Sequence, residues 1–327
     1  MSPRTILPDA RQFPRYAGLC TFGRYPRIED VGGSVDWAIY GVPYDGGVSY
    51  RPGARFGPRA IREASQYIKT YHLEHDLTIT EEFSLADAGD APIEPYACEG
   101  TSRTVSDHAE SIGDPSHTRL IALGGDHSIA LANIRATYNR LGKPIGGMPL
   151  IHFDAHLDTV DTLWGERHSH ASPFIRAIEE GLIDPKRMIS IGIRGPLNTK
   201  KDLEYAHDHG ITIVSAEQWH CCAGHESLDE FVEQLGDPAY ISFDIDVADP
   251  VFAPGTGTPA IGGLSSVQIL EALQLLANPS SGRGISVAGA DIVEVLPDRD
   301  PTGITTLLAA QIVFEILCVD GVSRRKS

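Results

Sequence analysis

Eight short, almost continuously apolar runs are the sequence feature that most restricts the fold of this chain. They lie at residues 37–41, 83–86, 119–123, 150–153, 188–193, 211–214, 239–243 and 286–292. Strands that are buried on both faces have this composition, whereas half-buried strands alternate apolar and polar residues. The runs therefore predict eight strands that lie in the interior of a sheet covered on both sides.

The segments between the runs have features of helices. Pro58 suits the first turn of a helix. Ser265 and Gln268 have the spacing of a capping box for a helix through Leu276, and residues 305–317 form a strongly apolar terminal helix. Strands that alternate with helices predict a three-layer α/β/α fold with an eight-stranded, mostly parallel sheet.

The composition restricts the partners of the protein. The chain has 27 Lys and Arg against 44 Asp and Glu, a net charge of -17. Such a surface repels nucleic acid and anionic membranes and attracts small cations. We see no apolar run of about 18 residues and no secretion signal, so we expect neither a membrane span nor export. Five scattered cysteines are typical of a reducing cytoplasm, where we place the protein.

Acids and histidines follow four of the predicted strands. Asp154-Ala155-His156-Leu157-Asp158 follows one run, Asp244-Ile245-Asp246 another, Gly124-Gly125-Asp126-His127 a third, and Glu294 the last. Residues i and i+2 of an extended chain point to the same side. Because ligands of open α/β sheets bind beyond the carboxyl ends of the strands, these side chains are expected to share one site.

The residue types at this site indicate bound metal. Four carboxylates cannot share a pocket unless cations lie between them. The candidate ligands are too many for one zinc and suit two ions with bridging carboxylates: His127, Asp154, His156, Asp158, Asp244 and Asp246. Oxygen-rich ligation without thiols favours manganese, and the imidazoles also admit nickel, cobalt or iron. Two ions roughly 3.5–4 Å apart generate a hydrolytic nucleophile at neutral pH.

The order of these motifs resembles the arginase/agmatinase family of ureohydrolases, in its agmatinase-like branch. The likeness extends to Gly41-Val42-Pro43-Tyr44-Asp45, to Arg51-Pro52-Gly53-Ala54-Arg55 and to Ala253-Pro254-Gly255-Thr256-Gly257-Thr258-Pro259. It implies an arginase-like sheet, a binuclear manganese site, and hydrolysis of a guanidino C–N bond to urea and an amine. It also implies homo-trimers or homo-hexamers, with hetero-oligomers left open.

The resemblance suggests how the chain is divided. Residues 35–320 would form a single ureohydrolase catalytic domain. Residues 1–34 would be an extension that packs on this domain or on a neighbouring subunit, and residues 321–327 a C-terminal tail.

The resemblance also assigns roles to single residues. His127, Asp154, Asp158 and Asp244 would hold one ion, and His156, Asp154, Asp244 and Asp246 the other. Asp158 would pass a proton toward the leaving amine. Glu294 would hold the substrate guanidinium, and His170 would relay protons beside the substrate, with His168 as a rival.

The loop after Asp158 departs from the arginases. Arginases carry an Asn-Thr-Pro type of run there for the α-amino acid group, but this chain has residues 159–166 with Trp164, whose indole would wall the pocket. L-arginine is therefore disfavoured, and agmatine or a guanidino acid such as guanidinobutyrate is favoured. Asp161 or Glu166 would suit the amine of agmatine, whereas Arg167 would suit a carboxylate.

Three alternatives stay open at this stage. One is a nickel-dependent hydrolase of guanidine, an alkylguanidine or a biguanide such as metformin. A second is an amide hydrolase with one zinc, similar to histone deacetylases. The third is a non-catalytic partner subunit of a hetero-oligomeric ureohydrolase.

Overall fold

The fold is built on one sheet of eight strands in which every neighbouring pair is parallel, as the apolar runs predict. The computed structural model describes residues 4–326 except 33, 237, 279–281 and 283. The strands lie in the order β4-β1-β5-β10-β9-β6-β7-β8. Their bounds are β1 Trp37–Gly41, β4 Leu85–Asp90, β5 Arg119–Leu123, β6 Met148–Phe153, β7 Ile183–Ile193, β8 Thr212–Ser215, β9 Ala239–Asp244 and β10 Val287–Val293.

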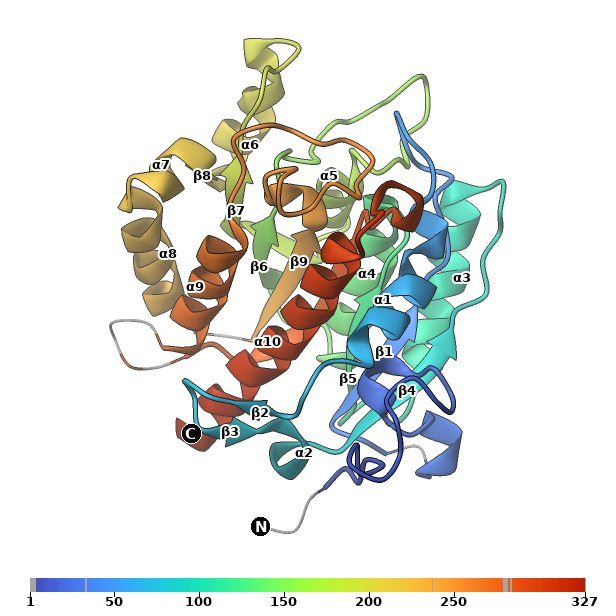
Figure 1. Ribbon diagram of the computed structural model, residues 1–327. Coiled ribbons are helices and arrows are strands. Elements are labelled where there is room, and N and C mark those ends of the chain that lie inside the picture. The colour runs from blue at the N-terminus through green and yellow to red at the C-terminus, as the bar shows by residue number, and fades with distance from the viewer. Residues whose placement is uncertain (1–3, 33, 237, 279–281, 283, 327) are drawn as a thin grey trace.

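Helices cover both faces of the sheet, which confirms the three-layer architecture (Figure 1). One face packs on α1 (Gly57–Ser65), α7 (Ala216–His220), α8 (Ala223–Gln234), α9 (Ser266–Ala277) and α10 (Ile304–Lys326). The other packs on α3 (Cys98–Ser111), α4 (Ala130–Arg140), α5 (Pro173–Glu179) and α6 (Glu204–His209). Successive strand residues alternate between these two cores: Ile151 faces the α9–α10 side and Leu150 the α4–α5 side.

Short elements complete the chain. A hairpin of β2 (Tyr71–His72) and β3 (Leu77–Thr78) precedes α2 (Ile79–Glu82). The 3₁₀ turns are η1 Phe22–Arg24, η2 Ile28–Asp30, η3 Ala54–Phe56, η4 His127–Ile129, η5 Lys200–Leu203, η6 Ile245–Val247 and η7 Pro297–Arg299.

The terminal helix α10 corrects the expectation that the chain has no apolar run of membrane-spanning length. It is long and apolar enough to cross a membrane, with a mean hydropathy of 1.7. However, 83% of its apolar stretch is buried within the fold. It packs along α1 and α9 as a core helix, which agrees with the predicted apolar helix at residues 305–317.

The two ends of the chain both join this core. Phe22 is fully buried, and its backbone N–H donates to Asp87 Oδ2 over 2.7 Å. Thr5 Oγ1 donates to the carbonyl of Phe83 over 2.9 Å. Residues 321–326 continue α10 without a break. The described part of the N-terminal extension thus packs on its own chain, while the division into three parts stays a prediction.

Replacing the N-cap of α9 tests the predicted capping box, which the structure confirms: Ser265 Oγ accepts from the Gln268 N–H, and the Gln268 side chain accepts from the Ser265 N–H. Ser265→Ala is expected to lower the free energy of unfolding by about 1 kcal/mol in urea titrations. Ser227→Ala, within α8, is the control and should change it by less than about 0.5 kcal/mol. Equal effects of the two variants would contradict the cap.

Candidate metal centre

The strands that carry the predicted site residues are neighbours. In the sheet, β5, β10, β9 and β6 lie side by side. His127 follows β5 and opens η4, Glu294 follows β10, Asp244 ends β9, and Asp154 follows β6. Because all four strands run in parallel, their carboxyl ends bring these side chains to one edge.

Three carboxylates converge on His127. Its Nδ1 lies 2.8 Å from Asp158 Oδ2, 3.2 Å from Asp154 Oδ2 and 3.3 Å from Asp244 Oδ2. The nitrogen is buried and makes no hydrogen bond of good geometry in the part of the chain described. Its other ring nitrogen, Nε2, lies 2.9 Å from Ser242 Oγ, which itself donates to Asp291. Ser242 therefore accepts from Nε2–H. In the neutral ring, Nδ1 would then present its lone pair to the space among the carboxylates, as a metal ligand requires.

A second group forms around His156. Its Nδ1 lies 3.2 Å from Asp154 Oδ1 and 3.1 Å from Asp246 Oδ2. The two oxygens of Asp154 thus face different histidines, which suits a carboxylate that bridges two ions. The His156 side chain is 40% exposed, while Asp154 and Asp246 are fully buried, so the second group borders solvent.

The charges of these groups are strongly coupled. Burial opposes ionisation of Asp154, but the neighbouring imidazoles of His127, His152 and His156 hold its pKa well below the usual range. The pKa of Asp244 is raised well above the usual range by burial and by Asp246 and Asp154. Burial opposes protonation of His156, but the neighbouring Asp246 and Asp154 raise its pKa to about 12. Without cations, protons must supply part of the positive charge that the carboxylates need.

Glu294 lies beside this cluster in an unusual conformation. It is fully buried and has a φ of 62°, which is rare for a residue other than glycine. Its Oε1 accepts from the His127 N–H and lies 3.0 Å from His170 Nδ1. Its Oε2 is buried and has no hydrogen-bond partner among the described residues. Such an orphaned carboxylate oxygen is costly and indicates a missing donor.

His170 is held between two opposing partners. Burial lowers its pKa, but the hydrogen bond with Glu294 outweighs this and raises the pKa to about 9. The backbone N–H of Ser49 points at Nε2 from 3.0 Å and favours the neutral ring. The ring therefore lies between a partner that stabilises its charged form and one that stabilises its neutral form.

Two predicted residues make no hydrogen bond or ion pair with this cluster. Trp164 is 79% exposed at a turn, has a φ of 53°, and makes no hydrogen bond to any described residue. His168 lines a different cleft, with Arg135 and Glu180. The structure thus brings His170, not His168, to Glu294.

Two of the three charged residues predicted to meet the far end of the substrate are paired within the chain, while Glu166 is exposed and makes no ion pair with any described residue. Asp161 pairs with Arg176, and Arg167 Nη2 lies 2.9 Å from Glu179 Oε2. Neither Asp161 nor Arg167 is therefore a free charge for the far end of a substrate.

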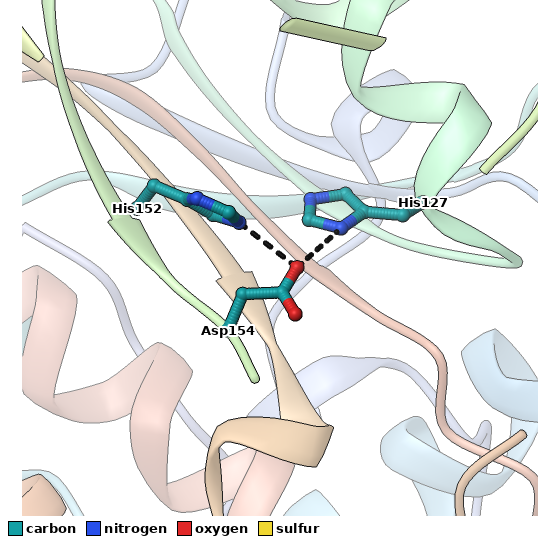
Figure 2. Close-up of side chains that lie close together, drawn as sticks. All are labelled: His127, His152 and Asp154. Carbon is teal, nitrogen blue, oxygen red and sulfur yellow. Dashed lines mark hydrogen bonds and ion pairs between the residues drawn. The ribbon is translucent and has the colours of Figure 1, made fainter. Parts of the chain in front are cut away.

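Sequence reasoning missed a buried layer of polar residues beneath the predicted ligands. It contains His152, whose Nε2 lies 2.9 Å from Asp154 Oδ2 (Figure 2), together with Ser242 and Asp291. His152 and Ser242 each stand two residues before a predicted ligand, Asp154 and Asp244, so the period of two along a strand could have found them. Asp126 lies in one of the predicted strand-end runs but was assigned no role; its Oδ2 accepts from the Gly47 N–H, and burial and Glu294 raise its pKa to about 6.

Comparison with known proteins identifies the family to which this architecture belongs. The model of the arginase family matches residues 35–319. The chain belongs to the arginase family. It is 38% identical to a guanidinopropionase of Pseudomonas aeruginosa, over 98% of this chain and 97% of that protein. It is 39% identical to a mitochondrial agmatinase of Gallus gallus, over 96% and 89% of the two chains.

A solved structure supports the same family. Proclavaminate amidino hydrolase of Streptomyces clavuligerus superposes with a TM-score of 0.86 at 38% identity, covering 95% of this chain and all of that one. As an arginase-family ureohydrolase, the protein is a hydrolase that acts on C–N bonds, and its family depends on a binuclear metal centre. The two His and Asp groups at the strand ends fit such a centre.

Metal removal tests the centre. Adding Mn²⁺ or Ni²⁺ to chelator-treated protein is expected to raise its melting temperature, because ions that bind only the folded state stabilise that state. At an ion concentration a hundredfold above Kd, the free energy of unfolding should rise by about 2.7 kcal/mol. Asp154→Asn should lose most of this rise, and the exposed Asp107→Asn control should keep it. Scanning calorimetry measures both. A wild-type melting temperature that neither ion changes would contradict the assignment.

Proposed function

We propose that the protein cleaves the guanidino C–N bond of a small cationic guanidino compound, giving urea and an amine, with agmatine or a guanidino acid such as guanidinobutyrate as substrate. The observation that carries this proposal is the Oε2 atom of the Glu294 carboxyl group, which is buried and has no donor among the described residues. A guanidinium offers planar N–H donors and a positive charge, and so it matches this oxygen.

Glu294 would act by orientation. A guanidinium is stabilised by resonance and is a poor electrophile, so its carbon must be held toward the nucleophile. His127 and His170 fix Oε1 and leave Oε2 to the substrate. Gly257 supports this role, because a Cβ there would lie 3.2 Å from Oε2 and would occupy the space of a donor.

The metals would supply the nucleophile. The proposed ligands His127, Asp154, His156, Asp158, Asp244 and Asp246 would hold two divalent ions, and such ions supply a water of near-neutral pKa when they are bound. Asp158 has one oxygen 2.8 Å from His127 Nδ1 and would accept the proton of the attacking water. Breaking the C–N bond transfers an electron pair to the leaving nitrogen, which must then gain a proton. His170 is protonated below a pKa of about 9 and would help to deliver it.

Manganese is the proposed metal, because carboxylates outnumber imidazoles in the ligand set. Nickel stays as the alternative, since the imidazoles of His127 and His156 in the ligand set also admit it. With nickel, guanidine, an alkylguanidine or a biguanide such as metformin would become the alternative substrate.

The proposal leaves both charges possible for the end of the substrate that lies away from the guanidinium group. Because Asp161 and Arg167 are paired within the chain, neither of these two residues selects the amine of agmatine or the carboxylate of a guanidino acid. Among the similar proteins, one is named for guanidinopropionate and one for agmatine.

We also propose a homo-trimer or homo-hexamer in the cytoplasm. Val267, Ile304 and Leu307 are 62%, 40% and 42% exposed, and such an assembly would cover them. The free thiols of all five cysteines support a reducing compartment.

Release of urea tests the proposal directly. Protein loaded with Mn²⁺ or Ni²⁺ should release urea from agmatine or a guanidino acid with a higher kcat/KM than from arginine. The panel includes guanidinobutyrate, guanidinopropionate, guanidine and metformin. Two bound ions without urea from any substrate would favour a non-catalytic partner subunit, and one ion per chain would favour the zinc amide hydrolases.

Glu294→Gln tests the guanidinium anchor. The variant is expected to lower kcat/KM on the best substrate by about 10²-fold or more, because it removes one partner of a buried ion pair. Its metal content should equal that of wild type. Glu217→Gln, at an exposed position on α7, is the control and should retain wild-type kinetics. An unchanged kcat/KM for Glu294→Gln would mean that the anchor lies elsewhere.

A further inference from the structure

His152 is a fully buried histidine that none of the roles above uses. It lies on β6, two residues before Asp154, and its Nε2 lies 2.9 Å from Asp154 Oδ2. Figure 2 shows His127 and His152 meeting this same carboxylate oxygen, His127 from 3.2 Å. A buried imidazole beside a carboxylate that bridges two metal groups must either bind metal or hold the carboxylate.

The surroundings of His152 fix its orientation. Its Nδ1 lies 3.1 Å from Ser190 Oγ, and Ser190 is its register partner on β7. Phe174 of α5 packs against the ring with centroids 4.4 Å apart. Because the Asp154 carboxylate only accepts hydrogen bonds, Nε2 carries the proton and Nδ1 of the neutral ring accepts from the Ser190 hydroxyl. In that arrangement the Ser190 hydroxyl donates to Nδ1 and supports the tautomer that donates to Asp154.

The contacts of His152 argue against direct metal binding. Of the carboxylates around His127, it contacts Asp154 but neither Asp158 nor Asp244. In an octahedral site, each ligand atom lies roughly 3 Å from every other ligand atom except the one on the opposite side of the ion. A ligand of the ion at His127 would therefore approach at least one of Asp158 and Asp244 as well.

We propose that His152 is a positioning residue: by donating from Nε2 it holds the Asp154 carboxylate, whose oxygens face both ligand groups, in the orientation that the ions would need. The proposal rests on the proposed function, since it needs ions at both groups. Removing a hydrogen bond of this kind from a ligand typically lowers metal affinity about 10–100-fold. The number of ions bound at saturation should not change.

Calorimetric Mn²⁺ titration and the electron paramagnetic resonance spectrum of the loaded protein test this role. His152→Phe keeps the ring shape against Phe174 but loses the donor, so it should bind two ions 10–100-fold more weakly, with an altered spectrum. His152→Gln keeps an N–H near the Nε2 position and should recover most of the affinity. Ser190→Ala should shift affinity in the same direction as His152→Phe, by less. His108→Phe, which removes an imidazole that packs on Tyr40 away from the site, is the matched control.

Each outcome supports or overturns the positioning role of His152. Wild-type affinity and spectrum in His152→Phe would overturn the proposal, as would the loss of one whole ion at saturation, which would make His152 a ligand. If His152→Phe does not fold, Ser190→Ala with wild-type affinity would overturn it. A wild-type protein that binds neither Mn²⁺ nor Ni²⁺ would instead refute the proposed function itself.

Discussion

The carboxylate of Asp154 is the interaction on which the rest of the site depends. It is fully buried, and its two oxygens meet three imidazoles, those of His127 and His152 through Oδ2 and that of His156 through Oδ1. Asp244, Asp246 and Asp158 add like charges around it. A fold that buries so many acids together is stable only if cations compensate them. The buried carboxylates therefore need bound cations for stability, and the same cations would serve the hydrolysis.

The backbone at the strand ends shows how the fold serves this centre. Asp158 and Glu294 both have positive φ values, 52° and 62°. Such conformations cost about 1–3 kcal/mol each and persist where the surroundings over-determine them. Both residues follow central strands of a buried parallel sheet, whose packing supplies that constraint. The strain is thus located where it directs a carboxylate toward the centre.

Much of this arrangement could be predicted from the sequence, because its signals are local. Apolar runs give the eight strands, and acids directly after them give the edge of the sheet where the six proposed ligands gather. Strand β4 was predicted too short, because Asp87 and Asp90 are polar; at the edge of the sheet Arg62 pairs with both. That pairing joins residues far apart in sequence, and no local pattern encodes it.

The contacts that sequence reasoning missed are of the same long-range kind. The exposed position of Trp164, the pairing of Asp161 with Arg176 and the contact of His152 with Ser190 depend on how distant elements pack. The choice between His168 and His170 depended on the path of one loop past Glu294.

The most direct test of the account is an anomalous difference map from crystals soaked in Mn²⁺. The account predicts two peaks, one among His127, Asp154, Asp158 and Asp244 and one among His156, Asp154 and Asp246. A map without a peak between these side chains would contradict it.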